Sequence, residues 1–116
     1  MPRDLLDTGI SLFDGGSYFE AHEAFEDLWR PATGPARLMY QGLVQVCAGL
    51  VKHGRGQPGP ACTLLDKGLS KLETVPEACR EGLDLDRLVA DLRSVREAIA
   101  MARDFAAPAI HRLGRI

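Results

Sequence analysis

An imidazole and a carboxylate stand one helical turn apart in the segment His22-Glu23-Ala24-Phe25-Glu26. Residues i and i+4 of a helix lie over one patch of surface, so His22 and Glu26 can act on the same group. His22 also shares a helical stripe with the aromatic residues Phe25 and Trp29, which predicts that its imidazole is at least half buried. A buried polar group without a partner costs on the order of 1–3 kcal/mol. The pair therefore needs partners from elsewhere in the fold.

A second polar pair, Gln41 and Gln45, occurs at the same spacing in a segment that is otherwise apolar. Gly42 and Gly49 flank Gln45 on one helical face, where missing side chains let another helix approach closely. We expect the helix that carries His22 to pack on this face. The four polar side chains would then form a network between the second and third helices.

Three interpretations of such a network stay open. In the first, the network only fixes the register of two helices. In the second, it lines a small-molecule pocket, with Trp29 as an apolar wall and His22 as acid or base. In the third, His22 and Glu26 are two ligands of a catalytic metal, as in HExxH sites with the second His replaced, and His53 or Glu23 supplies the third ligand. A neutral Gln is a poor ligand for a transition metal, and we expect no metal or other cofactor.

The elements that must position these residues are all helical. Apolar spacing and the Gly and Pro residues between the periodic segments predict five helices: residues 4–14, 17–30, 34–52, one that follows the loop 54–60, and one from about 85 that ends at Pro108. The sequence thus predicts an all-α, compact bundle whose first four helices form two hairpins. The stretch from Gly16 to Phe25 has a weak similarity to the turn and second helix of a tetratricopeptide repeat, although the internal offset here is 40 residues and that repeat uses 34. We expect a single helical domain over residues 1–107 and a short basic, frayed tail over 108–116.

Composition excludes several classes of protein. The chain has 116 residues, a formal net charge of −2 and 46% hydrophobic residues. This length fits one domain with its own core, and the charge argues against a basic nucleic-acid binder. The longest apolar stretch, 43–51, is too short to span a membrane, and the first residues do not resemble a signal peptide. Three Cys without CxxC spacing indicate reduced thiols, so we expect a cytoplasmic protein.

The run from Phe13 to Arg30, which contains Tyr18-Phe19-Glu20-Ala21-His22-Glu23, resembles a small prokaryotic family. Gln41-Gly42-Leu43-Val44-Gln45 and Arg55-Gly56-Gln57 resemble it as well. The family is known as domain of unknown function number three hundred and nine, and the resemblance covers about residues 5–75. It implies an all-helical cytoplasmic domain and brings no established activity, substrate or cofactor. The family's polar signature falls on these positions of the chain: His22, Glu26, Trp29, Arg30, Gln41 and Gln45. Gln57 departs from it, since the family tends to Asn there.

These residues lead to one expected function and two alternatives. We expect a binding module whose polar pocket between the second and third helices takes a small polar ligand or a peptide terminus. The first alternative is a metal-assisted or acid–base hydrolase that uses His22 and Glu26. The second is a scaffold without chemistry, in which the fifth helix or another apolar face packs on a second copy of the chain. We expect neither nucleic acid nor a membrane among the partners.

Overall fold

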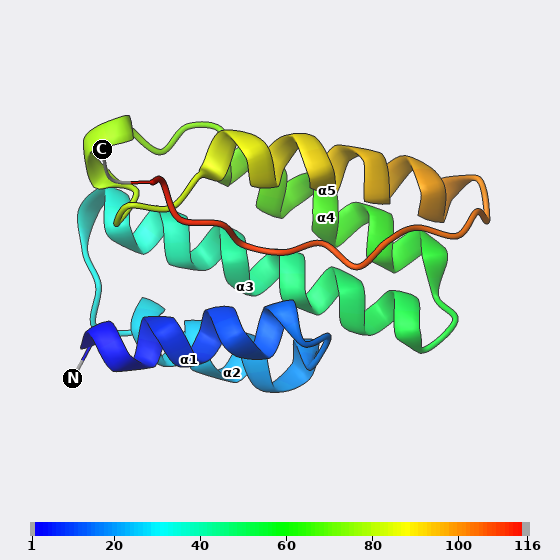
Figure 1. Ribbon diagram of the computed structural model, residues 1–116. Helices are drawn as coiled ribbons and strands as arrows, with labels where there is room; N and C mark the ends of the chain where they lie inside the picture. Colours follow the sequence, from blue (N-terminus) through cyan, green and yellow to red (C-terminus); the bar gives the residue numbers. More distant parts are fainter. Residues whose placement is uncertain (1, 115–116) are drawn as a thin grey trace.

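The central helix of the computed structural model is α3 (Gly34–Gly54), which is apolar on most of its sides. The structure describes the backbone of residues 2–114 and the side chains of residues 5–114. The other helices are α1 (Pro2–Asp14), α2 (Tyr18–Trp29), α4 (Pro58–Leu72), a short 3-10 helix (Glu77–Cys79) and α5 (Leu85–Ala100). The described residues form no strand, only an isolated bridge between Leu83 and Arg112. The predicted all-α bundle of five helices is confirmed (Figure 1).

The first four helices form two hairpins, as predicted. In the first, the Phe25 ring of α2 fills the space left by Gly9 of α1, where an added Cβ would meet the ring at 2.7 Å. In the second, α3 and α4 approach closely at three glycines. Added Cβ atoms would lie 2.9 Å from the Leu72 side chain at Gly42 and 3.0 Å from the Ala61 carbonyl oxygen at Gly49.

The prediction that α2 packs on this glycine face is therefore wrong. Gly42 and Gly49 face α4, where Gly68 provides the matching gap, and not α2. A glycine in a helix indicates that some backbone comes close. It carries no information about which neighbouring helix supplies that backbone.

The fifth helix ends earlier than predicted, at Ala100 and not at Pro108. Ala102 adopts a left-handed conformation with a φ of 54°. The Arg103 N–H donates to the Ala98 carbonyl oxygen at 2.7 Å, which closes the helix end in the manner of a Schellman motif. Glycine usually holds that left-handed position, so an alanine gave no signal for the helix end.

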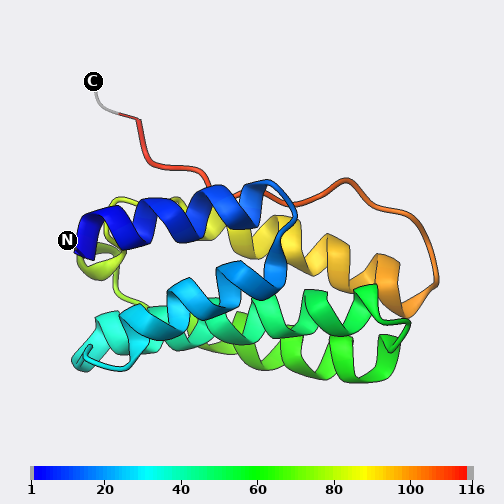
Figure 2. The ribbon, with the colours of Figure 1, turned by 90° about the horizontal axis from the view of Figure 1, so that it is seen from below.

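After α5 the chain runs back as an extended segment, residues 101–114, which we name the strap. Figures 1 and 2 show that the strap lies between α1 and α5 and passes over α3. The Ile110 N–H donates to Asp14 Oδ1 at 2.8 Å, and the Ile110 side chain is 4% exposed. The Asp84 N–H donates to the His111 carbonyl oxygen at 2.8 Å. The expectation of a frayed tail is therefore wrong as far as residue 114.

Two further expectations concern the membrane and the thiols. Over the residues that the structure describes, no helix has the length and apolarity needed to cross a membrane.

The three cysteines are free, and Cys47 is buried in α3. Burial raises the pKa of the Cys47 thiol, because a thiolate would lose its hydration there. Cys47 is therefore a core residue and not a nucleophile.

Candidate functional site

Helix α2 brings His22 and Glu26 together at the predicted spacing. His22 Nε2 lies 3.5 Å from Glu26 Oε2, and the two side chains are 25% and 29% exposed. The other carboxylate oxygen, Glu26 Oε1, accepts a hydrogen bond from Arg30 at 2.6 Å, and Arg30 also donates to Asp27 at 2.8 Å. A continuous row of polar groups therefore runs along this face of α2, with Glu26 at its centre.

Two buried nitrogen atoms on this face have no hydrogen-bond partner among the residues that the structure describes. They are Nδ1 of His22 and Nε1 of Trp29. The two residues are seven positions apart, so their side chains leave the same side of the helix about 10.5 Å apart along its axis. Most buried polar atoms in proteins are paired, and each exception calls for an explanation such as a ligand.

An arginine from α3, which the sequence analysis did not single out, holds Trp29 in place. The Arg37 guanidinium lies 4.4 Å from the centre of the Trp29 ring. It also donates to the Trp29 carbonyl oxygen at 3.1 Å and to the Ala32 carbonyl oxygen at 3.4 Å. Because the last carbonyls of a helix carry partial negative charge, a cation is favourable there. Arg37 thus caps α2 and fixes the Trp29 ring at once.

Replacing Arg37 by alanine is expected to lower the free energy of unfolding by about 2 kcal/mol. This estimate adds a charged hydrogen bond to a cation–π contact. The control is Arg30→Ala, which removes a guanidinium that is 61% exposed and should cost less than about 1 kcal/mol. Urea unfolding of both variants measures the difference. Equal losses would contradict the role given to Arg37.

The two glutamines do not complete the expected network. Gln45 turns to α4, where its Oε1 accepts a hydrogen bond from Lys71 Nζ at 2.8 Å. Gln41 is half-buried and makes no hydrogen bond to any residue that the structure describes. The Gln45 amide is thus bound to Lys71 of α4, while the Gln41 amide has no partner among the described residues.

The residues considered as metal ligands are not gathered. Within residues 5–114, no three His, Cys, Asp or Glu side chains lie close enough to hold a metal ion. His53 instead packs against the strap, with its ring centre 5.1 Å from that of Phe105, and Glu23 is exposed. His22 and Glu26 alone fall short of the three protein ligands typical of a catalytic zinc site.

An exposed aromatic residue adjoins the polar row and was missed by the sequence analysis. Phe19 is 51% exposed, and its ring lies nearly parallel to the His22 imidazole, at 13° and with 6.3 Å between ring centres. Its position three residues before His22 was a signal that was available. We name His22, Glu26, Trp29, Arg30 and the neighbouring Phe19 the α2 site.

Comparison with known proteins places the α2 site inside a recognised sequence family. The family model described as Domain of unknown function (DUF309) matches residues 6–64, which run from α1 into α4. The chain is also 29% identical over 100 residues to the uncharacterized protein YpuF of Bacillus subtilis (strain 168). That similarity covers 84% of this chain and 58% of the length of the relative. Helix α5 and the strap lie outside the segment that the family model matches.

Proposed function

The chain belongs to the DUF309 family, and from the geometry of its α2 site we propose that it is a binding module for a small polar ligand or a peptide terminus. The observation that carries this proposal is the pair of buried, unpartnered nitrogen atoms, His22 Nδ1 and Trp29 Nε1. A fold gains nothing from leaving such atoms unpaired, since each costs on the order of 1–3 kcal/mol. A ligand that pairs with them recovers this free energy on binding.

The two nitrogen atoms define the chemistry of the ligand. An indole Nε1–H only donates, so the ligand must offer Trp29 an acceptor such as a carbonyl or carboxylate oxygen. If His22 Nε2 carries its proton toward Glu26, the free Nδ1 is an acceptor, and the ligand then offers it an N–H or O–H group. A short peptide carries both kinds of group and is long enough to reach two side chains about 10.5 Å apart, whereas a simple amide can pair with only one of the two atoms at a time. The exposed Phe19 ring, which lies beside His22, gives further apolar contact.

The charges of the α2 site favour a ligand with little net charge. Glu26 is shared by His22 and Arg30, and Arg30 also binds Asp27. The carboxylates of Glu26 and Asp27 outnumber the Arg30 guanidinium, so they disfavour an anion, and a cation would compete with Arg30 for them. A neutral or zwitterionic molecule would leave these pairs intact, so amides, amino acids and short peptides are the first ligands to test.

Thermal unfolding of the protein with a panel of acetamide, the amino acids and diglycine tests the proposal. At a ligand concentration of 100 times Kd, binding stabilises the fold by about 2.7 kcal/mol. For a chain of this length we expect the melting temperature to rise by about 10 °C. His22→Ala should abolish this rise. The variant itself should lose less than about 1 kcal/mol of stability, because its pair with Glu26 is partly exposed.

Glu23→Gln is the matched control, since Glu23 is an exposed carboxylate on the same helix. It should keep the full rise in melting temperature, whereas Glu26→Gln should reduce it. A rise that survives in His22→Ala would show that the ligand binds elsewhere. A His22→Ala variant that is strongly destabilised without ligand would favour a structural role for the pair.

A further inference from the structure

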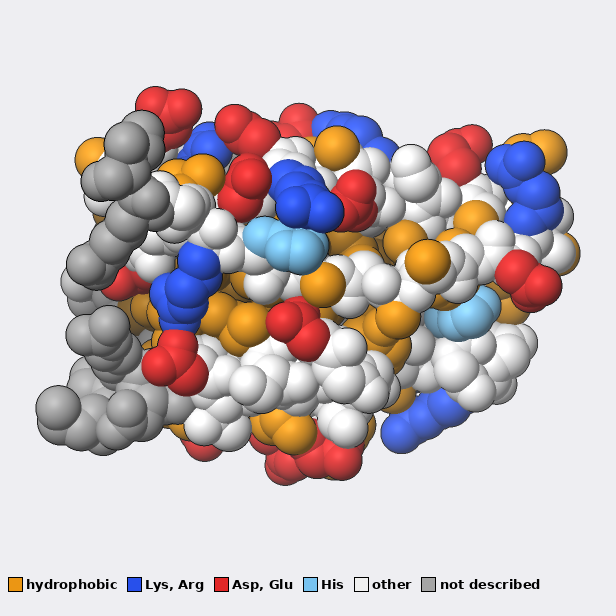
Figure 3. Space-filling view, in the orientation of Figure 1, with side chains coloured by type: hydrophobic (Ala, Val, Ile, Leu, Met, Phe, Trp, Pro, Cys, Tyr) orange, Lys and Arg blue, Asp and Glu red, His pale blue; other side chains and the backbone are white. Residues whose placement is uncertain are grey.

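A cavity lies between α5 and the strap, away from the α2 site. Its volume is about 470 Å³, within the range typical of small-molecule sites. Figure 3 shows apolar side chains gathered along this face between charged groups. The cavity exists because α5 ends at Ala100 and the chain returns in extended form. It therefore depends on the part of the fold that the sequence did not predict.

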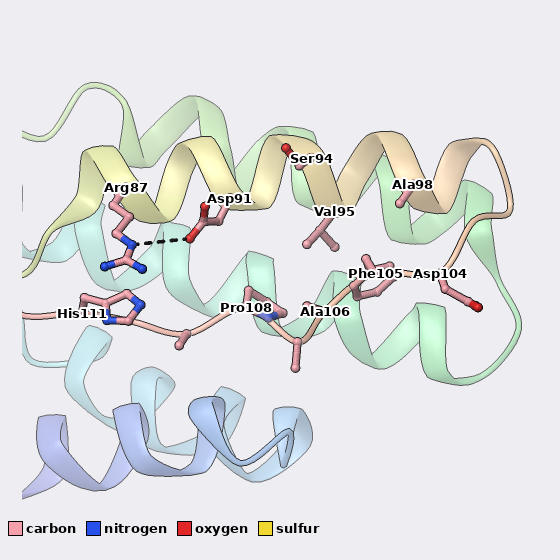
Figure 4. A pocket seen from close by; sticks show the side chains of 12 residues that line it. Arg87, Asp91, Ser94, Val95, Ala98, Asp104, Phe105, Ala106, Pro108 and His111 are labelled. Atoms are coloured by element: carbon pink, nitrogen blue, oxygen red, sulfur yellow. Dashed lines mark ion pairs between the residues drawn. The ribbon is translucent and has the colours of Figure 1, made fainter.

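The two ends of the cavity differ in polarity (Figure 4). At one end the Arg87 side chain of α5 points across the opening toward His111 of the strap. Toward the other end Val95 and Phe105 face the interior, and the carboxylate of Asp104 lies at the rim beyond Phe105. A ligand that matches these walls has one polar end and one apolar end.

The Arg87 guanidinium has hydrogen-bonding capacity to spare. Its described ion-pair partner is Asp91, at 3.9 Å between Nε and Oδ2, which is beyond hydrogen-bond distance. A guanidinium offers five N–H donors in a planar fork that matches a carboxylate. The His111 imidazole on the opposite wall can donate an N–H to the same anion.

The strap adds unpaired main-chain groups along the cavity. Residues 104–109 make no main-chain hydrogen bond to any residue that the structure describes. Pro108 nevertheless is buried and holds this stretch against the bundle. The wall of the cavity is thus an anchored, extended segment with free amide groups that can hydrogen-bond to a ligand.

We propose that this cavity binds a small carboxylic acid with a compact apolar group, such as a branched-chain acid. The carboxylate binds between Arg87 and His111, and the apolar group packs on Val95 and Phe105. This site is separate from the α2 site and does not depend on the proposed function.

Titration of the ¹⁵N-labelled protein with isovalerate, followed by NMR, tests this site. Isovaleramide has the same shape without the charge, and acetate has the charge without the apolar group. We expect both to bind at least tenfold more weakly than isovalerate. The shifted resonances should belong to α5 and to strap residues 104–111.

Three exposed positions on α5 supply the variants. Arg87→Gln should weaken isovalerate binding at least tenfold. Asp91→Asn should strengthen binding, because it removes the carboxylate that competes for Arg87. Arg93→Gln is the matched control, since Arg93 is as exposed as Arg87 (56% against 57%) but pairs with Glu73; its affinity should stay within twofold of the unmodified protein. Undetectable isovalerate binding, an Arg87→Gln variant that binds normally, or isovaleramide that binds equally well would overturn the proposal.

Discussion

Phe25→Ala is expected to lower the free energy of unfolding by about 3–5 kcal/mol, the cost typical of truncating a buried phenylalanine. The Phe25 side chain is fully buried, and its ring fills the gap that Gly9 leaves in α1. Helix α1 would not collapse easily into the space left behind, because the strap holds its last residue, Asp14, through the Ile110 N–H. Chemical denaturation followed by circular dichroism measures this loss.

The control for this prediction is Phe19→Ala on the same helix. Phe19 is 51% exposed, so its truncation should change the free energy of unfolding by no more than about 0.5 kcal/mol. A loss below about 1 kcal/mol in Phe25→Ala, or losses of similar size in the two variants, would show that α1 and α2 do not pack as described.

Gly68→Ala carries the second large expected effect, a net loss of about 2 kcal/mol. An added Cβ would lie 2.7 Å from the Gly42 carbonyl oxygen and 3.0 Å from the Val46 backbone nitrogen. Both are main-chain atoms, so α3 and α4 would have to move apart. Overpacking of this kind typically costs 1–3 kcal/mol or more, and it outweighs the gain of about 1 kcal/mol in helix propensity when alanine replaces glycine. The midpoint of urea unfolding reports the loss.

Gly59→Ala is the control in the same helix. Gly59 lies in the first turn of α4, and an added Cβ there would meet nothing within 4 Å. Because Gly59 is at the helix end and precedes Pro60, we expect little gain in helix propensity, and the free energy of unfolding should change by less than about 1 kcal/mol. A Gly68→Ala variant that behaves like Gly59→Ala would contradict the close approach of α3 and α4.

Helices could be predicted from the sequence wherever apolar spacing and a Gly or Pro boundary agreed. The end of α2 near Pro31 and the start of α3 at Gly34 are examples. The end of α5 could not, because Ala102 takes the left-handed position without a glycine to mark it. The strap could not be predicted for the same reason. The sequence analysis places the end of the fifth helix at Pro108, whereas Pro108 anchors an extended segment.

In the candidate site, contacts within one helix could be predicted from the sequence, and contacts between helices could not. The pairing of His22 with Glu26 follows from spacing within one helix, and the structure has it. The contacts of Gln45 with Lys71 and of Arg37 with Trp29 join different helices. They depend on which faces of the helices meet, and spacing along one helix does not contain that information.

The indole N–H resonance of Trp29 tests the binding proposal most directly. The chain has one tryptophan, so a ¹⁵N-labelled sample gives a single indole signal. It comes from the nitrogen atom that has no partner within the described part of the chain. With the panel of amides, amino acids and diglycine, the proposal predicts that at least one compound shifts this signal in a saturable way and slows its hydrogen exchange. The same compound should leave the signal of the His22→Ala variant unchanged. An indole signal that no member of the panel moves, or one that moves equally in His22→Ala, would contradict a binding site on α2.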